Sequence, residues 1–273
     1  MSTEAPNIPL KTHVGRARWD EHDYHGFELF GELAGKESFS SLVALAVSGR
    51  RVPPEDWPVL DDIAAIVGVA DPSIWPLKIT RVISSYGRVL PAMACASLLY
   101  ESHHVGPLTA VQGAASLRAI HDALGPSNPD DSYDDAAVER AIVAYLSRTR
   151  RLAGFGVPFR AQDERLVALR KCITLRGRER KKFWVLNEKY MDVVRRERGL
   201  EPNVSIATCA VLLDLGFQAD EVPFICYAFH QHAQLANAVE GARQAPEILR
   251  RLPPEKVRYM GVPPRASPRS RGL

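Results

Sequence analysis

Histidines stand in two close pairs, and imidazole is the side chain that most readily moves protons near neutral pH. His103 and His104 precede a helical pattern, whereas His230 and His232 lie within one. Each pair also fits a purely structural role, as a solvated loop pair or as side chains that point off a helix. Because His230 and His232 are two residues apart, they lie on different helix faces. No cysteine or carboxylate stands at ligand spacing to either pair, so we predict no metal site.

Two other segments have the composition of a site for a phosphorylated ligand. The glycines of Gly154-Phe155-Gly156 would let a nucleotide approach the backbone closely, although a tight turn explains them as well. The basic run 176–182 (RGRERKK) would attract phosphates, but we favour the solvated start of a helix. Motifs typical of phosphate-binding glycine loops, zinc proteases and serine hydrolases do not occur in the sequence.

Apolar residues at helical spacing predict an almost all-helical chain to position these groups. The predicted helical faces cover 42–46 with Gly49 as a stop, 57–67, 138–146 with Asp135 as the cap, 183–194 before Gly199, 206–213 before Gly216, and 222–239. The run 90–99 is apolar on every side, which predicts a buried central helix. No segment has the alternating pattern of a strand.

Composition excludes several classes of protein. The 273 residues, 46% of them hydrophobic, suffice for one core, or for two lobes that share one, without disulfides. Lys and Arg together number 35 against 32 Asp and Glu, which is too balanced for a nucleic-acid-binding face. Small anionic ligands remain compatible with this charge.

Cysteine usage and hydropathy indicate the compartment. The four cysteines are far apart and form no C-x-x-C pair, so we expect reduced thiols in a cytoplasmic protein; they are Cys95, Cys172, Cys209 and Cys226. The run 89–100 is too short to span a bilayer. The polar start of the chain lacks the apolar core of a signal peptide. We therefore expect no membrane partner.

Several short motifs resemble, in the same order, those of short citrate synthase and citryl-CoA lyase relatives. They are 24–29 (YHGFEL), 38–39 (SF), 48–53 (SGRRVP), 81–92 (RVISSYGRVLPA), 106–108 (GPL) with Ala115, Leu117 and Arg118, 154–156 (GFG) with 163–165 (DER), 203–204 (NV), 259–261 (YMG) and 263–265 (PPR). Each motif alone is only moderately specific. Because the motifs follow one another in the same order over about residues 14–265, the chain resembles members of the citrate synthase superfamily.

The resemblance implies an all-α, citrate synthase-like fold of two lobes around a cleft. The large helical domain would comprise residues 14–108 and 206–265, and the small helical domain residues 109–205. A disordered N-terminal tail (1–13) and a basic tail (266–273) would flank them. Closure of the lobes would exclude water from the site. The resemblance also implies a homodimer, with a hetero-oligomer containing an active paralogue as the alternative.

Enzymes of this superfamily remove a proton beside a CoA thioester, which requires a carboxylate base and a donor to the enolate oxygen. The resemblance places the base at Ser205, whose hydroxyl cannot take that proton unaided. The histidine of the family's G-F-G-H motif falls at Val157, and that of its D-H-G motif near Gly68. Three positions that usually carry the chemistry therefore hold other residues.

Other site positions keep a usable group. Arg165 retains the arginine of the family's D-P-R element, and His230 stands where a second arginine is expected. When the motif is aligned without a gap up to Arg118, the position of the family's enolate-stabilising histidine holds Thr109. An alignment shifted by five residues places His104 at this position instead. The resemblance also implies CoA contacts at the following residues: Gly154, Phe155, Gly156 and Arg160.

Three functions follow from this combination. The first is an acyl-CoA-dependent former or cleaver of carbon–carbon bonds that works on a non-standard oxo- or carboxylic acid, without a permanently bound cofactor. The second is a catalytically inactive homologue that binds a CoA thioester or serves as a partner subunit. The third is a lyase or decarboxylase whose substrate needs no base for an α-proton, which would account for Ser205.

Overall fold

The computed structural model describes residues 10–99, 107–125, 134–157, 161–244 and 254–262. His103, His104 and Arg160 lie outside these residues. The elements run in the order β1 (Gly15–Ala17), β2 (His22–Tyr24), β3 (Phe27–Glu28), η1 (Leu29–Leu33), α1 (Phe39–Ser48), η2 (Pro54–Asp56), α2 (Trp57–Val67), α3 (Trp75–Ser84), α4 (Val89–Leu99), α5 (Pro107–Leu124), α6 (Asp135–Arg148), α7 (Glu164–Leu175), α8 (Lys182–Arg198), α9 (Val204–Asp214), α10 (Val222–Ala242) and η3 (Pro254–Lys256). The predicted helical class is confirmed.

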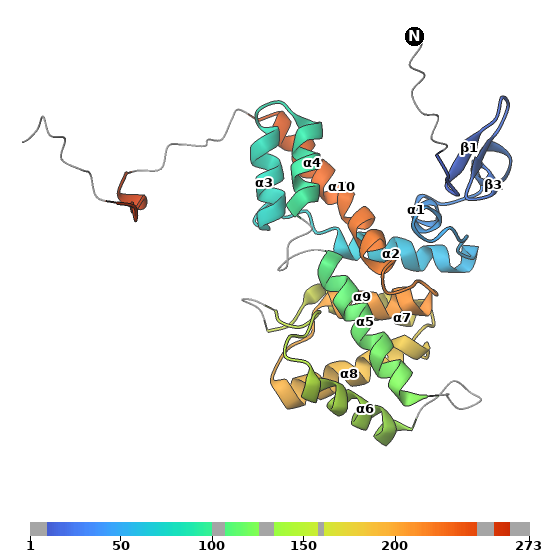
Figure 1. Cartoon of the computed structure of the whole chain (residues 1–273), viewed down its shortest axis with the longest axis vertical. Helices are drawn as coiled ribbons and strands as arrows, with labels where there is room; N and C mark the ends of the chain where they lie inside the picture. The colour runs from blue at the N-terminus through green and yellow to red at the C-terminus, as the bar shows by residue number, and fades with distance from the viewer. Residues whose placement is uncertain (1–9, 100–106, 126–133, 158–160, 245–253, 263–273) are drawn as a thin grey trace, which may run out of the picture.

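Two helices organise the packing (Figure 1). Every residue of α9 from Ile206 to Leu213 is buried, because α5, α7 and α8 pack around it. The longer α10 packs against α2, α3, α4 and α5 and thereby joins the helices of the N-terminal third to α5. The apolar residues of α2, α5, α7, α8, α9 and α10 form one continuous core. Burial of this core is the main term that favours the folded state.

Local capping chemistry sets the helix ends largely as predicted. Ser38 accepts a hydrogen bond from the Ser41 amide at the start of α1, and Gly49 ends that helix with a φ of 67°. Gly199 ends α8 in the same way. The predicted cap Asp135 is wrong by one residue, because Asp134 accepts from the Ala137 amide and Asp135 is already helical.

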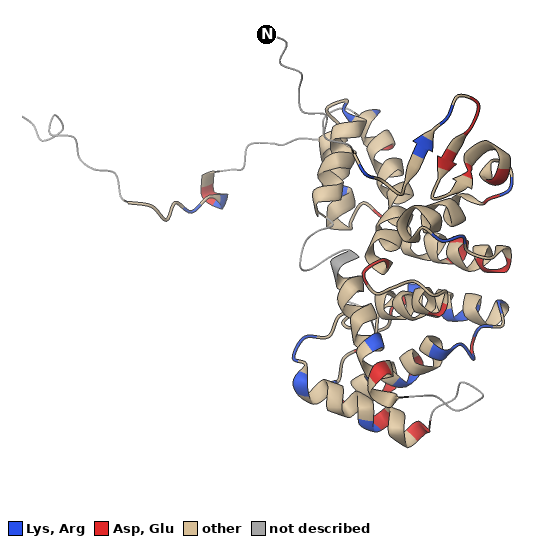
Figure 2. Ribbon diagram, turned by 45° about the vertical axis from the view of Figure 1, so that its right-hand side comes forward, with Lys and Arg blue, Asp and Glu red and all other residues tan. Residues whose placement is uncertain are grey.

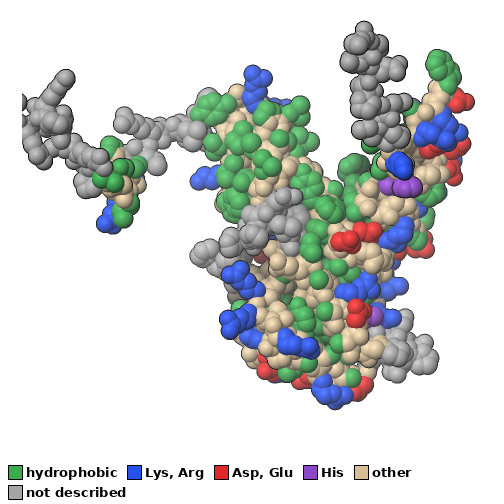
Figure 3. All heavy atoms as spheres, viewed as in Figure 1, with side chains coloured by type: hydrophobic (Ala, Val, Ile, Leu, Met, Phe, Trp, Pro, Cys, Tyr) green, Lys and Arg blue, Asp and Glu red, His purple; other side chains and the backbone are tan. Residues whose placement is uncertain are grey.

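The prediction of a buried central helix at 90–99 is wrong for a single chain. In α4 only Ala92 and Ala96 are buried, whereas the side chains of Leu90 and Leu98 are 78% and 77% exposed. Hydrophobic side chains gather over α3 and α4 (Figure 3). The single chain thus leaves part of this uncharged helix apolar and exposed.

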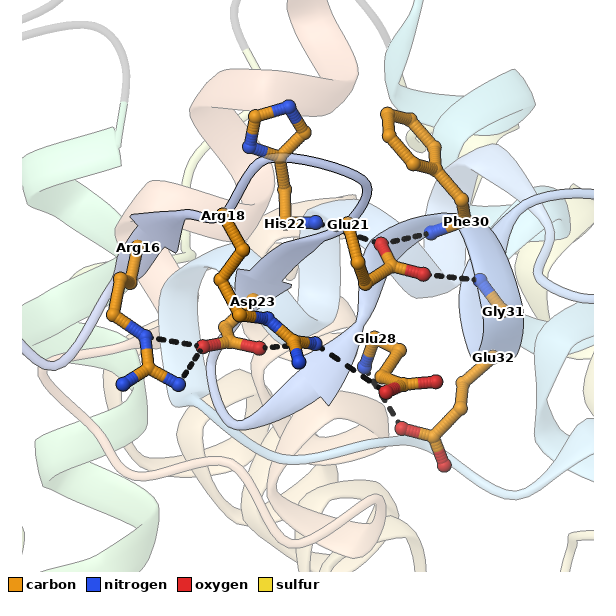
Figure 4. A network of polar contacts seen from close by, with 9 residues as sticks. All are labelled: Arg16, Arg18, Glu21, His22, Asp23, Glu28, Phe30, Gly31 and Glu32. Atoms are coloured by element: carbon orange, nitrogen blue, oxygen red, sulfur yellow. Dashed lines mark hydrogen bonds and ion pairs between the residues drawn. The ribbon is translucent and has the colours of Figure 1, made fainter.

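The small N-terminal sheet was not predicted, because its strands have only two or three residues and therefore no visible period. It has the order β1-β2-β3, with Arg16 opposite Asp23 and Asp23 opposite Glu28. Polar contacts hold it together (Figure 4). Glu21 accepts hydrogen bonds from the amides of Phe30 and Gly31, both at 2.9 Å. These bonds tie the β1–β2 turn to η1.

Charged side chains of both signs are interspersed along the chain (Figure 2). Pairs such as Arg170 with Glu188 and Arg196 with Glu139 link neighbouring elements of α6, α7 and α8. In the described part of the chain, no helix has both the length and the apolar character that a bilayer crossing needs.

Candidate functional site

Asp163, the residue just before α7, organises the candidate site, and sequence reasoning did not assign it a role. Its buried carboxylate accepts hydrogen bonds from Nε and Nη2 of Arg165, at 2.9 and 2.8 Å. It also accepts one from the backbone amide of Val204 at 2.9 Å. Burial alone would raise the pKa of Asp163, but the hydrogen bonds from Arg165 and Val204 lower it overall. Asp163 therefore fixes Arg165 to the first residue of α9.

Ser205 stands in the first turn of α9, directly after Val204. The side chain of Asn203 caps this helix by accepting a hydrogen bond from the Ser205 amide at 2.9 Å. The same side chain donates to the carbonyl oxygen of Gly156 at 3.2 Å. The predicted Ser205 and Gly156 are thus brought together around Asn203. The serine hydroxyl is only partly buried, and no carboxylate occupies its position.

The Gly154-Phe155-Gly156 segment pairs with the residues before α9. Phe155 forms an antiparallel bridge with Pro202. A Cβ atom at Gly154 would lie 2.5 Å from the Cβ of Ile206, and Gly154 has a φ of +82°. Packing therefore explains the glycine at 154. Gly156 has a φ of +97° but has nothing within 4 Å of its Cβ position, so its role as a ligand contact stays a prediction.

His230 lies on α10, partly buried. Its Nδ1 atom is 2.6 Å from the carbonyl oxygen of Cys226. Because a carbonyl only accepts, Nδ1 carries the proton and Nε2 carries the lone pair. Burial lowers the pKa of His230, and the positive charges of Arg165 and His232 lower it further, whereas the bond to Cys226 opposes them. Burial and the nearby positive charges thus favour the uncharged form of His230.

His232 was not assigned to the site, and it lies on a different face of α10 from His230. Its side chain is exposed, and its imidazole ring lies against the backbone of Gly68 at the end of α2. A Cβ atom at Gly68 would overlap this ring and would lie 2.9 Å from the carbonyl oxygen of Ala64. Gly68 has a φ of −79°, which any residue adopts, so space rather than backbone conformation requires the glycine.

Thr109 lies in the first turn of α5, at some distance from Ser205. The thiol of Cys209 donates to the carbonyl oxygen of Ala110 at 3.3 Å, whereas Gly113 lies against Ile206. Thr109 is therefore near Cys209, four residues or about 6 Å along α9 from Ser205. Its assigned role, and that of His104 outside the described residues, stay predictions.

The basic run before α8 has structural partners. Arg176 pairs with Asp62 at 2.9 Å, and Arg178 pairs with Asp56. Both bridges connect the α7–α8 loop to the first half of the molecule. Lys182, the last residue of the run, is the first residue of α8, in agreement with the prediction that the run leads into a helix.

A cavity of about 700 Å³ lies elsewhere, between α5 and α6. It is lined by several alanines together with Arg140, Tyr145 and Arg148. None of the predicted site residues lines it. It contributes no group to the pair of Asp163 and Arg165.

Comparison with known proteins relates this geometry to a fold. No protein-family model and no curated protein sequence matches the chain. Citryl-CoA lyase from Hydrogenobacter thermophilus matches with a TM-score of 0.78 at 20% identity, over 95% of this chain and 98% of that one. ATP citrate lyase from Methanothrix soehngenii, solved with citrate and coenzyme A, has a TM-score of 0.73 at 14% identity, over 99% of this chain and 44% of that one.

Citrate synthase from Thermotoga maritima has a TM-score of 0.57 at 16% identity, over 87% of this chain and 62% of that one. The chain thus spans nearly all of the lyase but less than two thirds of the other two proteins. These matches, together with the order of its helices, show that the chain has the all-helical citrate synthase-like fold.

Proposed function

We propose that this protein binds a CoA thioester and forms or cleaves a carbon–carbon bond in its acyl part. The observation that carries the proposal is the extent of the match to citryl-CoA lyase, which covers 98% of that chain. The neighbouring ATP citrate lyase was solved with citrate and coenzyme A. A fold hosts more than one chemistry, so the residues of the site must specify the reaction.

The site residues favour cleavage and a non-standard acid. Cleavage of a 3-hydroxyacyl thioester begins with loss of the hydroxyl proton of the substrate. It therefore does not need a base at position 205 that first removes an α-proton from the substrate. Arg165 offers its Nη1 group to a substrate carboxylate, because Asp163 uses Nε and Nη2. Burial lowers the pKa of His230, which stands where the resemblance places an arginine, and an uncharged imidazole attracts a second carboxylate less than an arginine does. The acid that leaves would therefore carry fewer carboxylates than oxaloacetate near this position.

A second candidate is a catalytically inactive homologue that binds the CoA ligand or serves as a partner subunit. The absence of acid–base groups at Ser205, Val157 and Gly68 favours it. In addition, Asp163 compensates the charge of Arg165, which weakens binding of an oxo-acid. The ligand-binding form of this candidate predicts binding of CoA without turnover, and the partner-subunit form predicts neither.

The same proposal includes two lobes that close over the ligand, a homodimer and a cytoplasmic location. The exposed apolar surface of α3 and α4 supports a second copy as the partner, because a single chain leaves Leu90 and Leu98 uncovered. The four cysteines are free thiols, which suits a reducing compartment.

The test combines binding and turnover. Calorimetric titration with CoA and acetyl-CoA measures ligand binding. Mass spectrometry follows the cleavage of (3S)-citryl-CoA and the condensation of acetyl-CoA with oxaloacetate, pyruvate and glyoxylate. We expect CoA binding together with turnover of at least one of these substrates. Binding without any turnover would support the inactive homologue that binds a CoA ligand, whereas no binding of either CoA species would contradict the first candidate and leave only the partner subunit.

A further inference from the structure

The groove between α5 and α6 has no part in the proposed function, yet it has the dimensions of a ligand site. The two helices lie side by side (Figure 1), and the groove that they form has a volume of about 700 Å³. Pockets that bind small molecules usually measure about 300–1,000 Å³. Neither Asp163 nor Arg165 nor Ser205 lines it. We call it the α5–α6 groove.

Small side chains keep the α5–α6 groove open. Ala119 and Ala123 of α5 and Ala144 of α6 line it, and all three are exposed. The exposed face of a helix usually carries longer polar side chains, and such a side chain at these positions would fill the groove. Ile120 and Leu124 add larger apolar groups to the lining. The hydrocarbon part of a ligand would therefore meet apolar groups and lose its contact with water.

The aromatic side chain in the lining is held in place before a ligand arrives. The hydroxyl oxygen of Tyr145 lies 2.6 Å from that of Ser116 on α5. Its ring also makes an edge contact with the ring of Tyr190, with the centroids 6.2 Å apart. A ligand would thus bind to a surface that is already ordered, which lowers the entropic cost of binding.

The charged residues that line the groove are both arginines, Arg140 and Arg148, and the lining contains no aspartate or glutamate. They are roughly two turns apart on α6, or about 12 Å along its axis. Nε of Arg148 donates to the carbonyl oxygen of Ala144 at 3.2 Å, and in the described part of the chain Arg148 forms no ion pair. Arg140 is 3.9 Å from Asp134, with both side chains well exposed, and such a pair contributes little. Both arginines can therefore bind an acid group.

We propose that the α5–α6 groove binds an aliphatic carboxylate. The hydrocarbon chain lies against the alanines and Tyr145, and the acid group binds Arg140 or Arg148. Charge complementarity selects this occupant, because a neutral molecule leaves the guanidinium groups unused and an amine meets two like charges. The inference does not depend on the proposed function, since the groove shares no residue with that site.

The test is calorimetric titration of the full chain with octanoate, with 1-octanol and octylamine as the neutral and cationic probes of equal chain length. We expect saturable binding of octanoate with a Kd below about 1 mM, and at least roughly tenfold weaker binding of the other two probes. Ala144→Leu fills the groove and should weaken octanoate binding by about tenfold or more. Ala136→Leu, at an exposed position of α6 outside the lining, is the control and should leave it unchanged.

A second variant tests the charges. Replacing Arg140 and Arg148 together by glutamine should weaken octanoate binding by about tenfold and leave 1-octanol binding unchanged. Arg180→Gln, at an exposed arginine of the α7–α8 loop, is its control.

Three outcomes would overturn the inference and leave the proposed function intact. The first is absence of saturable octanoate binding. The second is equal affinity of wild type and Ala144→Leu for octanoate. The third is a dimer in light scattering that Ala144→Leu dissociates, because a second copy would then fill the groove.

Discussion

The carboxylate of Asp163 holds the guanidinium of Arg165 through Nε and Nη2, at 2.9 and 2.8 Å, and also accepts the amide of Val204. One buried side chain thus links the start of α7 to the start of α9. The arginine that would hold a substrate carboxylate and the helix that carries Ser205 cannot move independently. Preorganisation of this kind is what a binding site requires.

Asp163→Asn should therefore weaken both the fold and the site. The variant keeps the shape of the side chain but leaves Arg165 without its carboxylate partner, so we expect a loss of about 2–3 kcal/mol in the free energy of unfolding. Urea denaturation followed by circular dichroism measures it. Asp192→Asn, at an exposed ion pair with Arg195, is the control and should cause no measurable change. Equal stability of both variants would contradict the linking role of Asp163.

Two glycines of one segment should respond differently to alanine. At Gly154 the new Cβ would overlap Ile206 in addition to straining a positive φ, so Gly154→Ala should cost more than about 3 kcal/mol. At Gly156 only the backbone strain applies, which amounts to about 1 kcal/mol. Urea denaturation compares the two variants. Similar losses would show that contact with Ile206 is not what requires Gly154.

Asp214 should make stability depend on pH. Burial raises the pKa of this carboxyl from 3.8 to about 6, although the amides of Phe183 and Trp184 and the charges of Lys181 and Arg178 oppose the rise. A raised folded-state pKa means that the contribution is fully present below pH 3.8 and is lost as the pH rises through 6. About two pKa units correspond to at most roughly 3 kcal/mol.

Chemical denaturation of wild type and Asp214→Asn between pH 4 and pH 7.5 measures this contribution. Asparagine still accepts a hydrogen bond at the start of α8 but does not titrate in this range. The stability difference between the two proteins should therefore change across the interval, with wild type losing more as the pH rises. A constant difference would contradict the raised pKa.

The uncovered leucines of α4 should report on assembly. Leu90→Glu and Leu98→Glu place charges on a surface that we propose a second copy covers, so they should shift the molar mass from dimer to monomer in light scattering. Helical content should stay unchanged, because both side chains are exposed in the single chain. Leu175→Glu, also 75% exposed but at the end of α7, is the control. A monomeric wild type would contradict the proposed dimer.

Features that depend on local chemistry could be predicted from the sequence. The serine and glycine that bound α1, Ser38 and Gly49, act through backbone atoms a few residues away. Whether α4 is covered depends instead on what packs against it, and its composition does not contain that information. The sheet of β1, β2 and β3 escaped prediction because its turn is held by Glu21, a contact between side chain and backbone across nine residues.

The site was predictable only in part, because its residues meet through contacts between segments that are far apart in the sequence. Arg165 and Ser205 were found through the resemblance, but their link through Asp163 is a contact between segments 41 residues apart. An aspartate two residues before Arg165, at the start of a helix, was the available signal. The contact of His232 with Gly68 could not be predicted from spacing either, because the two residues are far apart in the chain.

Binding and proton exchange of acetyl-CoA test the central claim most directly. Wild-type protein would be titrated with acetyl-CoA in a calorimeter, and deuterium incorporation into the methyl group would then be followed in deuterated water with and without each oxo-acid. The account predicts saturable binding and exchange that Arg165→Ala diminishes when the oxo-acid is present. Absence of binding at millimolar acetyl-CoA, in a protein with its full helical content, would contradict it.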